Sequence, residues 1–260
     1  TNHTNTVTIN GILRVDGNNT ISNCPDIRMA GGSEIIVMHG CTLTVTKNTR
    51  LHGGCDEMWK GIYVENGASL RFADGSILED AEVGIDLQST PIDPCDLELT
   101  SGSSGTYSPC LLQDNYIDLR AKNSFTVSVQ PISNATFSFS GAFKTPYTGQ
   151  LLVPTNKPFA AIVLEDVASC QIGDNTGTTP KITIEKHGTG IFAKRSSFTV
   201  ENTVFIDIST GASYGAFPGT QNGWGIYAEA YNDQSMTIAG MGNSVGTSPP
   251  TFLRCKGGIE

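Results

Sequence analysis

The stretch that decides the fold is residues 34–43, EIIVMHGCTL, because the chain repeats its pattern several times. At a shift of 27 residues it aligns with residues 61–70, GIYVENGASL, and the alignment continues without a gap to Leu51 over Leu78. Residues 161–170, AIVLEDVASC, follow the same pattern. Self-similarity at a period of about 20 to 50 residues is typical of solenoids, propellers and arrays.

Each copy of the repeat contributes one aligned isoleucine, and we call this set the core column. In seven copies a second apolar residue follows two positions later, on the same face of a strand. The spacing varies from 23 to 45 residues, which indicates coils of constant core with insertions at their corners. The predicted members of the core column are Ile35, Ile62, Ile85, Ile117, Ile162, Ile191, Ile226 and Ile259.

This pattern predicts an all-β fold, a right-handed parallel β-helix of about eight or nine coils. A propeller needs about 40 to 45 residues for each blade, and a sandwich has no reason to keep one column. We expect a single domain over residues 1–260, with long corner loops inserted near 88–114, 142–160 and 211–223, where Pro, Gly, Ser and Thr interrupt the strands.

The composition disfavours two classes of partner, nucleic acid and the membrane interior. The net charge of −9 and a pI near 4.9 disfavour nucleic acid, whose phosphates would be repelled. No run of 18 apolar residues occurs, so no membrane-spanning segment is expected. We expect residue 1 to follow a removed segment, and the repeat that begins at Gly258 to continue in a longer chain.

Seven cysteines in a β-rich chain of low charge favour an oxidising compartment. A shift of 30 residues brings Cys24 next to Cys55 on adjacent coils, which predicts one disulfide. Cys95 and Cys110 bracket a loop without a core of its own, and a second disulfide is predicted there. Cys170 is expected to be a small buried apolar residue, and zinc is not expected because no C-x₂-C or Cys/His cluster occurs; Cys41 and Cys255 stay unassigned.

Residues between the inward positions of a strand must point outward, so candidate catalytic or binding residues are expected on this outer face. The alignment places Asp86 and Asp118, flanked by Gln88 and Arg120, next to each other on adjacent coils. Two carboxylates about 5 Å apart serve retaining glycoside hydrolysis, or bind Ca²⁺ together with loop carbonyls. Ca²⁺ is the one cofactor that this pattern suggests. The alternative is that both aspartates only keep the surface soluble.

Three aromatic rings, those of Tyr63, Phe192 and Tyr227, also point outward and suit stacking on the faces of sugars; the alternative is that inserted loops cover them. His187, in the tripeptide Lys186-His187-Gly188, is expected to be a surface turn residue rather than a general base.

A family resemblance rests on residues 54–64, GCDEMWKGIYV, followed by GASL (67–70) and ILEDA (77–81). This run resembles the repeats of large secreted β-helix proteins of bacterial surfaces, in the pectin-lyase-like superfamily, many of which are type IX secretion substrates. The resemblance implies a secreted or cell-surface protein, and enzymes of the superfamily catalyse on the outer face of one strand column. Residues 61–65 resemble the G-x-Y-x-E of pectin methylesterases, but the other catalytic motifs of these enzymes are absent, so no catalytic residue is carried over.

Three functions follow as expectations. The first is a non-catalytic extracellular module for surface adhesion or glycan binding, with a glycan or another surface protein as partner. The second is a polysaccharide-active enzyme, either a lyase or a glycoside hydrolase. The third is a structural subunit that associates with itself through the coil ends and stacks into a filament, because a β-helix without caps exposes unpaired strand edges.

Overall fold

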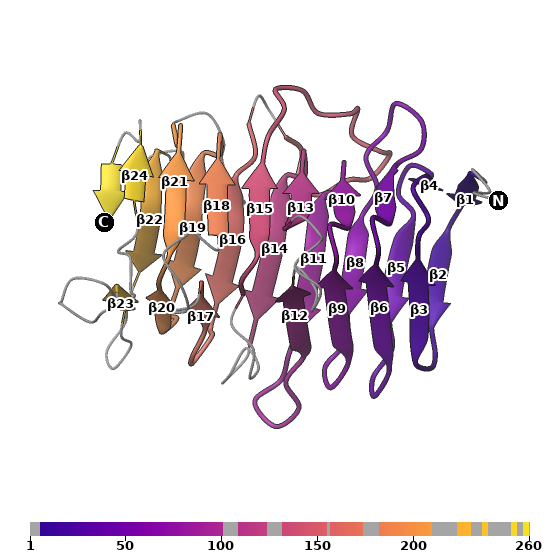
Figure 1. Cartoon of the computed structure of the whole chain (residues 1–260), viewed down its shortest axis with the longest axis horizontal. Helices are drawn as coiled ribbons and strands as arrows, with labels where there is room; N and C mark the ends of the chain where they lie inside the picture. The colour runs from indigo at the N-terminus through magenta and orange to yellow at the C-terminus, as the bar shows by residue number, and fades with distance from the viewer. Residues whose placement is uncertain are drawn as a thin grey trace.

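The computed structural model describes residues 6–100, 109–123, 132–154, 157–173, 182–209 and 223–229, together with the backbone of 236–238, 251–253 and 257–259. Within these ranges the chain is all β-strand and turn, without helix. All strand pairs are parallel, and successive coils add strands to two continuous sheets and to a third that is divided into two parts (Figure 1). The predicted parallel β-helix is therefore confirmed.

Sheet 1 has nine strands. They are β1 (Val7–Ile9), β4 (Ile27–Met29), β7 (Arg50–Gly53), β10 (Ile77–Glu79), β13 (Cys110–Gln113), β15 (Ala135–Ser138), β18 (Ile182–Glu185), β21 (Thr203–Ile206) and β24 (Thr251–Leu253).

Sheet 2 also has nine strands, which agrees with the expected eight or nine coils. They are β2 (Ile12–Val15), β5 (Glu34–Val37), β8 (Gly61–Val64), β11 (Val83–Gln88), β14 (Ile117–Lys122), β16 (Ala160–Glu165), β19 (Thr189–Lys194), β22 (Trp224–Glu229) and β25 (Gly257–Ile259).

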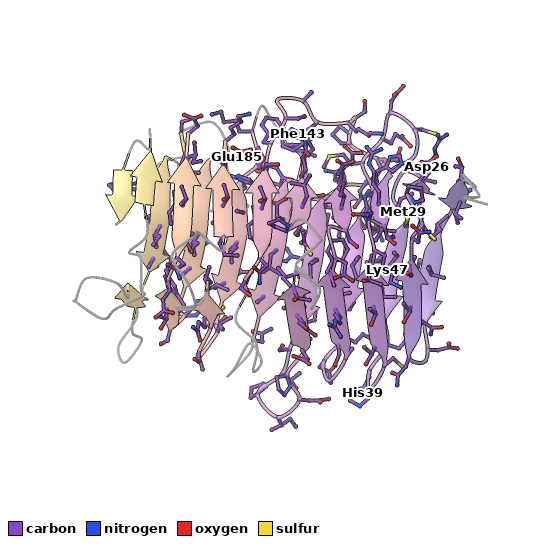
Figure 2. The ribbon with its side chains drawn as sticks, viewed as in Figure 1. Asp26, Met29, His39, Lys47, Phe143 and Glu185 are labelled. Carbon is purple, nitrogen blue, oxygen red and sulfur yellow. The ribbon has the colours of Figure 1, made fainter. Side chains whose placement is uncertain are left out.

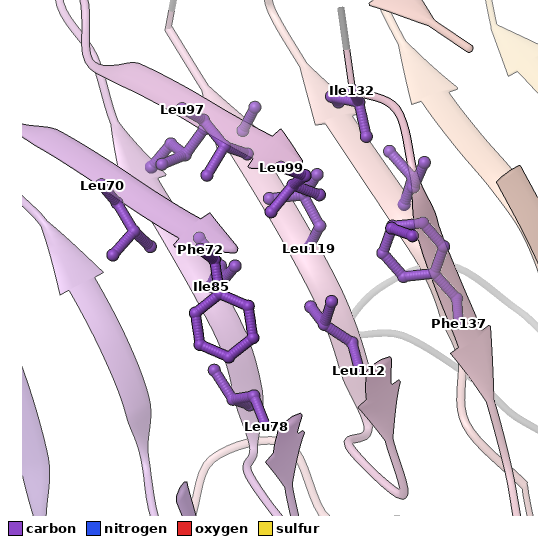
Figure 3. Packing of buried hydrophobic residues seen from close by; sticks show 14 of the residues in the cluster. Leu70, Phe72, Leu78, Ile85, Leu97, Leu99, Leu112, Leu119, Ile132 and Phe137 are labelled. Atoms are coloured by element: carbon purple, nitrogen blue, oxygen red, sulfur yellow. The ribbon is translucent and has the colours of Figure 1, made fainter. Parts of the chain in front are cut away.

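Sheet 3 is divided into two parts. One part holds β3 (Asn19–Ser22), β6 (Thr42–Thr46), β9 (Ser69–Ala73) and β12 (Asp96–Thr100); the other holds β17 (Gln171–Ile172), β20 (Phe198–Val200) and β23 (Met236–Ile238). Side chains from all three sheets meet in one apolar core between them, which Figure 3 shows around Leu70, Leu78 and Ile85.

The core column runs along sheet 2 in register, with one correction. Ile85 pairs with Leu119, not with Ile117, and Leu119 pairs in turn with Ile162. Ile117 instead belongs to a second apolar cluster outside the coil. The prediction was wrong by two residues because Ile117, Leu119 and Ala121 alternate with polar residues, so a shift of two keeps the same face inward.

One corner of the coil has a repeated backbone conformation. After β10, β13, β18 and β21 a single residue takes a positive φ, and the next residue points into the core. Short polar side chains adopt this left-handed conformation more readily than bulky ones. The corner residues are Asp80, Asp114, Lys186 and Asp207, and the buried residues that follow them are Ala81, Asn115, His187 and Ile208. Two of these four inward positions are therefore polar.

The predicted insertions differ from the structure in part. Residues 88–114 were expected to be one loop, but they contain β12, which pairs with β9 in sheet 3, and all of β13. The segment near 142–160 does leave the coil after β15 and runs back along the molecule toward β7 (Figure 1). The insertion near 211–223 lies outside the described residues, apart from Gly223.

Candidate cleft on the outer face of sheet 2

A cleft of about 370 Å³ lies on the outer face of sheet 2. Its floor comes from β5, β8, β11 and β14, and one wall comes from residues 139–154, which we call the strap. The lining residues are Glu34, Lys60, Gly61, Ile62, Tyr63, Glu82, Val83, Asp86, Arg120, Tyr147, Gly149 and Leu151. Ligand pockets of proteins span about 300–1,000 Å³, so this cleft is at the small end of that range.

Main-chain and lysine contacts hold the strap against coils far back in the chain. The ammonium of Lys144 donates to the carbonyl oxygens of Gly53 (2.6 Å) and Cys55 (2.8 Å). Thr145 forms a parallel bridge with Glu57, and its carbonyl accepts a hydrogen bond of 2.8 Å from the Met58 amide. These contacts place the strap beside the cleft.

Apolar packing adds to this attachment. Phe143, which Figure 2 labels on the strap, packs with Tyr147 and Leu152 against the second apolar cluster. That cluster includes Tyr116, whose ring centroid lies 6.3 Å from that of Phe143. Burial of these apolar side chains favours the position of the strap against sheet 2.

Glu82 joins the strap to the floor. One of its carboxylate oxygens accepts a hydrogen bond from the Tyr147 hydroxyl, and the other accepts one of 2.8 Å from the Leu152 amide. Burial raises the pKa of the Tyr147 phenol, and the hydrogen bond to Glu82 and its charge raise it further. Tyr147 therefore stays a hydrogen-bond donor over the physiological range.

Asp86 is held by two neighbours on the cleft floor. The guanidinium of Arg120 donates to both of its carboxylate oxygens, at 2.8 and 2.5 Å, and Gln88 donates to one of them at 2.7 Å. The register pairs Asp86 with Arg120 directly across β11 and β14. Bidentate pairs of this kind are among the stronger charge-assisted hydrogen bonds.

Tyr63 lies in the middle of the floor and is partly exposed. Burial raises the pKa of its phenol, and the nearby charge of Asp86 adds to this, so the hydroxyl keeps its proton at neutral pH. Among the residues that the structure describes, none hydrogen-bonds to this hydroxyl. On the strap, Leu151 is 88% exposed and also lines the cleft.

The predicted pair of Asp86 and Asp118 is not formed. Asp86 points outward, whereas Asp118 occupies the position before Leu119, where the neighbouring strands have Gly84 and Ala161, and its side chain is fully buried. A Cβ on Gly84 would lie 2.6 Å from the carbonyl oxygen of Asp118, so this position is tight. The two carboxylates therefore cannot act on one bond or share one Ca²⁺ ion.

Asp118 is instead part of a buried polar cluster. It accepts a hydrogen bond from Asn115 (2.9 Å) and pairs with the Nε2 atom of His187 at 2.8 Å. Burial raises the pKa of Asp118 to about 6, although both partners act to lower it. The prediction of His187 as a surface turn residue was wrong, because its side chain is fully buried and its Nδ1 atom lies 2.7 Å from the Glu185 carbonyl oxygen.

The other predicted rings lie farther along sheet 2. The register aligns Phe192 with Val163 and Tyr227 on the outer face, as expected. Phe192 is fully buried, however, so the interpretation of its ring as an exposed platform was wrong. Tyr227 stacks on Phe192 at 5.5 Å and 11°, which covers one face of its ring.

The predicted disulfides are absent from the structure. Cys95 and Cys110 are both buried but lie apart, Cys95 just before β12 and Cys110 at the start of β13. The thiol of Cys95 donates to the Glu65 carbonyl at 3.2 Å, and that of Cys110 to the Phe72 carbonyl at 3.1 Å. They are separated because β12 joins sheet 3 between them. Cys24 and Cys55 are also unpaired.

Two of the remaining three cysteines lie in the described residues, and both are free thiols. Cys170 is buried as expected, and burial raises its pKa to about 12. Cys41 is a free thiol, and Cys255 lies outside the described residues.

Sequence reasoning missed the strap side of the cleft, namely Glu82, Tyr147 and Leu151. No spacing in the sequence relates the strap to Glu82, which lies 65 residues before Tyr147 and 70 before Leu152. The described residues hold no group of three or more His, Cys, Asp or Glu side chains arranged to bind a metal ion. No helix within those ranges is long and apolar enough to span a membrane.

No family model, curated protein or solved structure matches this chain. The resemblance to the pectin-lyase-like superfamily therefore rests on the repeat alone, and a proposal about function has to rest on the cleft itself.

Proposed function

We propose that this chain is a non-catalytic extracellular β-helix module that binds glycan in the cleft on the outer face of sheet 2. The observation that carries the proposal is the partly exposed ring of Tyr63 on the floor, opposite a strap wall that presents Leu151. Tyrosine combines an apolar ring face with a polar hydroxyl, which suits the mixed surface of a sugar.

The state of the acidic groups supports binding rather than cleavage. Hydrolysis needs a positioned acid and base within reach of one bond. Both oxygens of Asp86 accept hydrogen bonds from Arg120, and both oxygens of Glu82 accept hydrogen bonds from the strap. Asp118, whose raised pKa would suit a general acid, faces the core.

The test is a glycan array probed with the purified chain, together with an assay for new reducing ends and unsaturated products on the same polysaccharides, with and without Ca²⁺. We expect binding without turnover. Cleavage that is lost in Asp86→Asn but kept in Asp118→Asn would establish the enzyme alternative instead. If neither binding nor cleavage is detected, electron microscopy for filaments with a regular axial repeat tests the assembly alternative.

A further inference from the structure

We infer that the cleft takes an uncharged sugar, a neutral hexopyranoside or a short neutral oligosaccharide, and discriminates against uronates. This inference rests on the proposed function, since it names the class of glycan bound at the same site. It follows from the way the charged groups of the cleft are already paired.

Arg120 is the cation on the cleft floor, and a uronate carboxylate would need to bind it. Its guanidinium already donates to both oxygens of Asp86, and the side chains of the two residues are only 15% and 10% exposed. An incoming carboxylate would displace Asp86 and leave a second, poorly solvated carboxylate beside it. Separating a buried pair in this way is strongly unfavourable.

Lys60 is the other cation of the lining and offers a weaker attraction. Its ammonium lies 3.7 Å from a carboxylate oxygen of Glu34, and its side chain is 44% exposed. A solvent-exposed lysine is screened by water and salt and contributes little to specific recognition. With Glu34, Glu82 and Asp86 present, the lining holds three carboxylates and two cations, so its net charge disfavours an anionic ligand.

The uncharged groups of the cleft remain available. The Tyr63 hydroxyl has no hydrogen-bond partner among the described residues, and its ring is partly exposed on the floor. Leu151 presents an apolar side chain from the opposite wall. A pyranose ring can place its C–H face on one of these side chains and a hydroxyl on the Tyr63 oxygen, without disturbing an ion pair.

The experiment compares tetrasaccharides of equal length by calorimetry at low ionic strength, where electrostatic effects are largest. The neutral probes are cellotetraose, mannotetraose and galactotetraose; the anionic probe is tetragalacturonate, and the cationic probe is fully deacetylated chitotetraose. We expect at least one neutral tetrasaccharide to bind about tenfold or more tightly than tetragalacturonate.

Two variant pairs locate the binding. Tyr63→Ala should weaken binding of the neutral tetrasaccharide by about tenfold, and Tyr63→Phe by less, because only the hydroxyl is lost. Leu151→Ser should weaken it, whereas Ile92→Ser should not, because Ile92 is an equally exposed apolar residue (95%) that does not line the cleft. Thermal unfolding of each variant checks that the fold is retained.

The outcomes separate this inference from the proposed function. If no tetrasaccharide binds, the proposed function fails and the inference fails with it. If tetragalacturonate or chitotetraose binds as tightly as the neutral probes or more tightly, glycan binding stands and the inference is overturned. If binding survives Tyr63→Ala and Leu151→Ser unchanged, the sugar binds outside the cleft and the inference is likewise overturned.

Discussion

The Nε2 atom of His187 lies 2.8 Å from a carboxylate oxygen of Asp118, inside the core and 69 residues away in the sequence. Asp118 is on β14 and His187 precedes β19, so the pair reaches across the intervening coil of β16. At the position aligned with Asp118, β16 has the small buried residue Ala161. The pair therefore ties two coils that are not neighbours in sheet 2.

The first prediction concerns pH. Because burial raises the pKa of Asp118 from 3.8 to about 6, the folded state holds this proton more tightly than the unfolded state. The stability that protonation contributes is present below pH about 4 and is lost as pH rises through about 6, on the order of 3 kcal/mol in total. Urea unfolding from pH 4 to 8 should show this slope in the native chain.

In Asp118→Asn the same contribution should be missing, so the difference between the two curves isolates the group from other carboxylates. A difference that does not change with pH would contradict the prediction. Asp166 serves as the opposite control: its pKa is lowered by Arg195, so its contribution is present above its unfolded pKa and is lost as pH falls.

The second prediction compares a buried pair with an exposed one. His187→Ala should destabilise the fold by about 3–5 kcal/mol at neutral pH, because it leaves a buried carboxylate without its partner. Asp166→Asn removes an ion pair to Arg195 in which both side chains are roughly 40% exposed, and should cost less than about 1 kcal/mol. Equal losses in chemical denaturation would show that the buried pair has no special role.

The third prediction tests the core column. Ile162→Asp should abolish folding, because a charge would be buried in the core without a partner. Thr44→Asp, on the outward face of β6 beside Arg71, should change stability by less than about 0.5 kcal/mol. Circular dichroism and size exclusion show whether each variant folds, and thermal unfolding followed by circular dichroism compares the stability of Thr44→Asp with that of the native chain. A folded Ile162→Asp chain would refute the assigned packing.

The fourth prediction concerns the strap. Tyr147→Phe removes the hydrogen bond to Glu82 and leaves part of a buried carboxylate unsatisfied, so opening of the strap should become easier by about 1–2 kcal/mol. The Leu152 amide donates to Glu82, and the Met58 amide donates to the Thr145 carbonyl of the strap. Faster hydrogen exchange at these two amides would report the opening. The amide of Ile191, in the body of sheet 2, should exchange as in the native chain.

The fifth prediction concerns thiols. Cys55 is exposed and should react quickly with a thiol reagent, whereas Cys110 and Cys170 should react only on unfolding, because burial raises the pKa of each to about 12. Cys55→Ser should remove the fast phase. Non-reducing peptide mapping that finds Cys95 linked to Cys110, or Cys24 linked to Cys55, would contradict the free state of these thiols.

The amino-acid sequence by itself determined the coil. Ile35, Ile62 and Ile85 recur with an apolar residue two positions later, and residues that share a strand face and recur in every coil must stack when the coils pair. Short-range alternation and the repeat are both local properties, so the fold class and the coil number could be predicted without coordinates.

Tertiary structure alone decided the register of β14 and the composition of the cleft. Alternation is satisfied equally by Ile117 or by Leu119 in the core column, and only packing against β11 and β16 selects Leu119. That choice sets Arg120 beside Asp86. Alternation also breaks at the start of β14, where Ile117 packs in the outer cluster and Asp118 is buried beside His187. The strap meets Gly53 across 91 residues of sequence, and such long-range contacts leave no periodic signal in the chain.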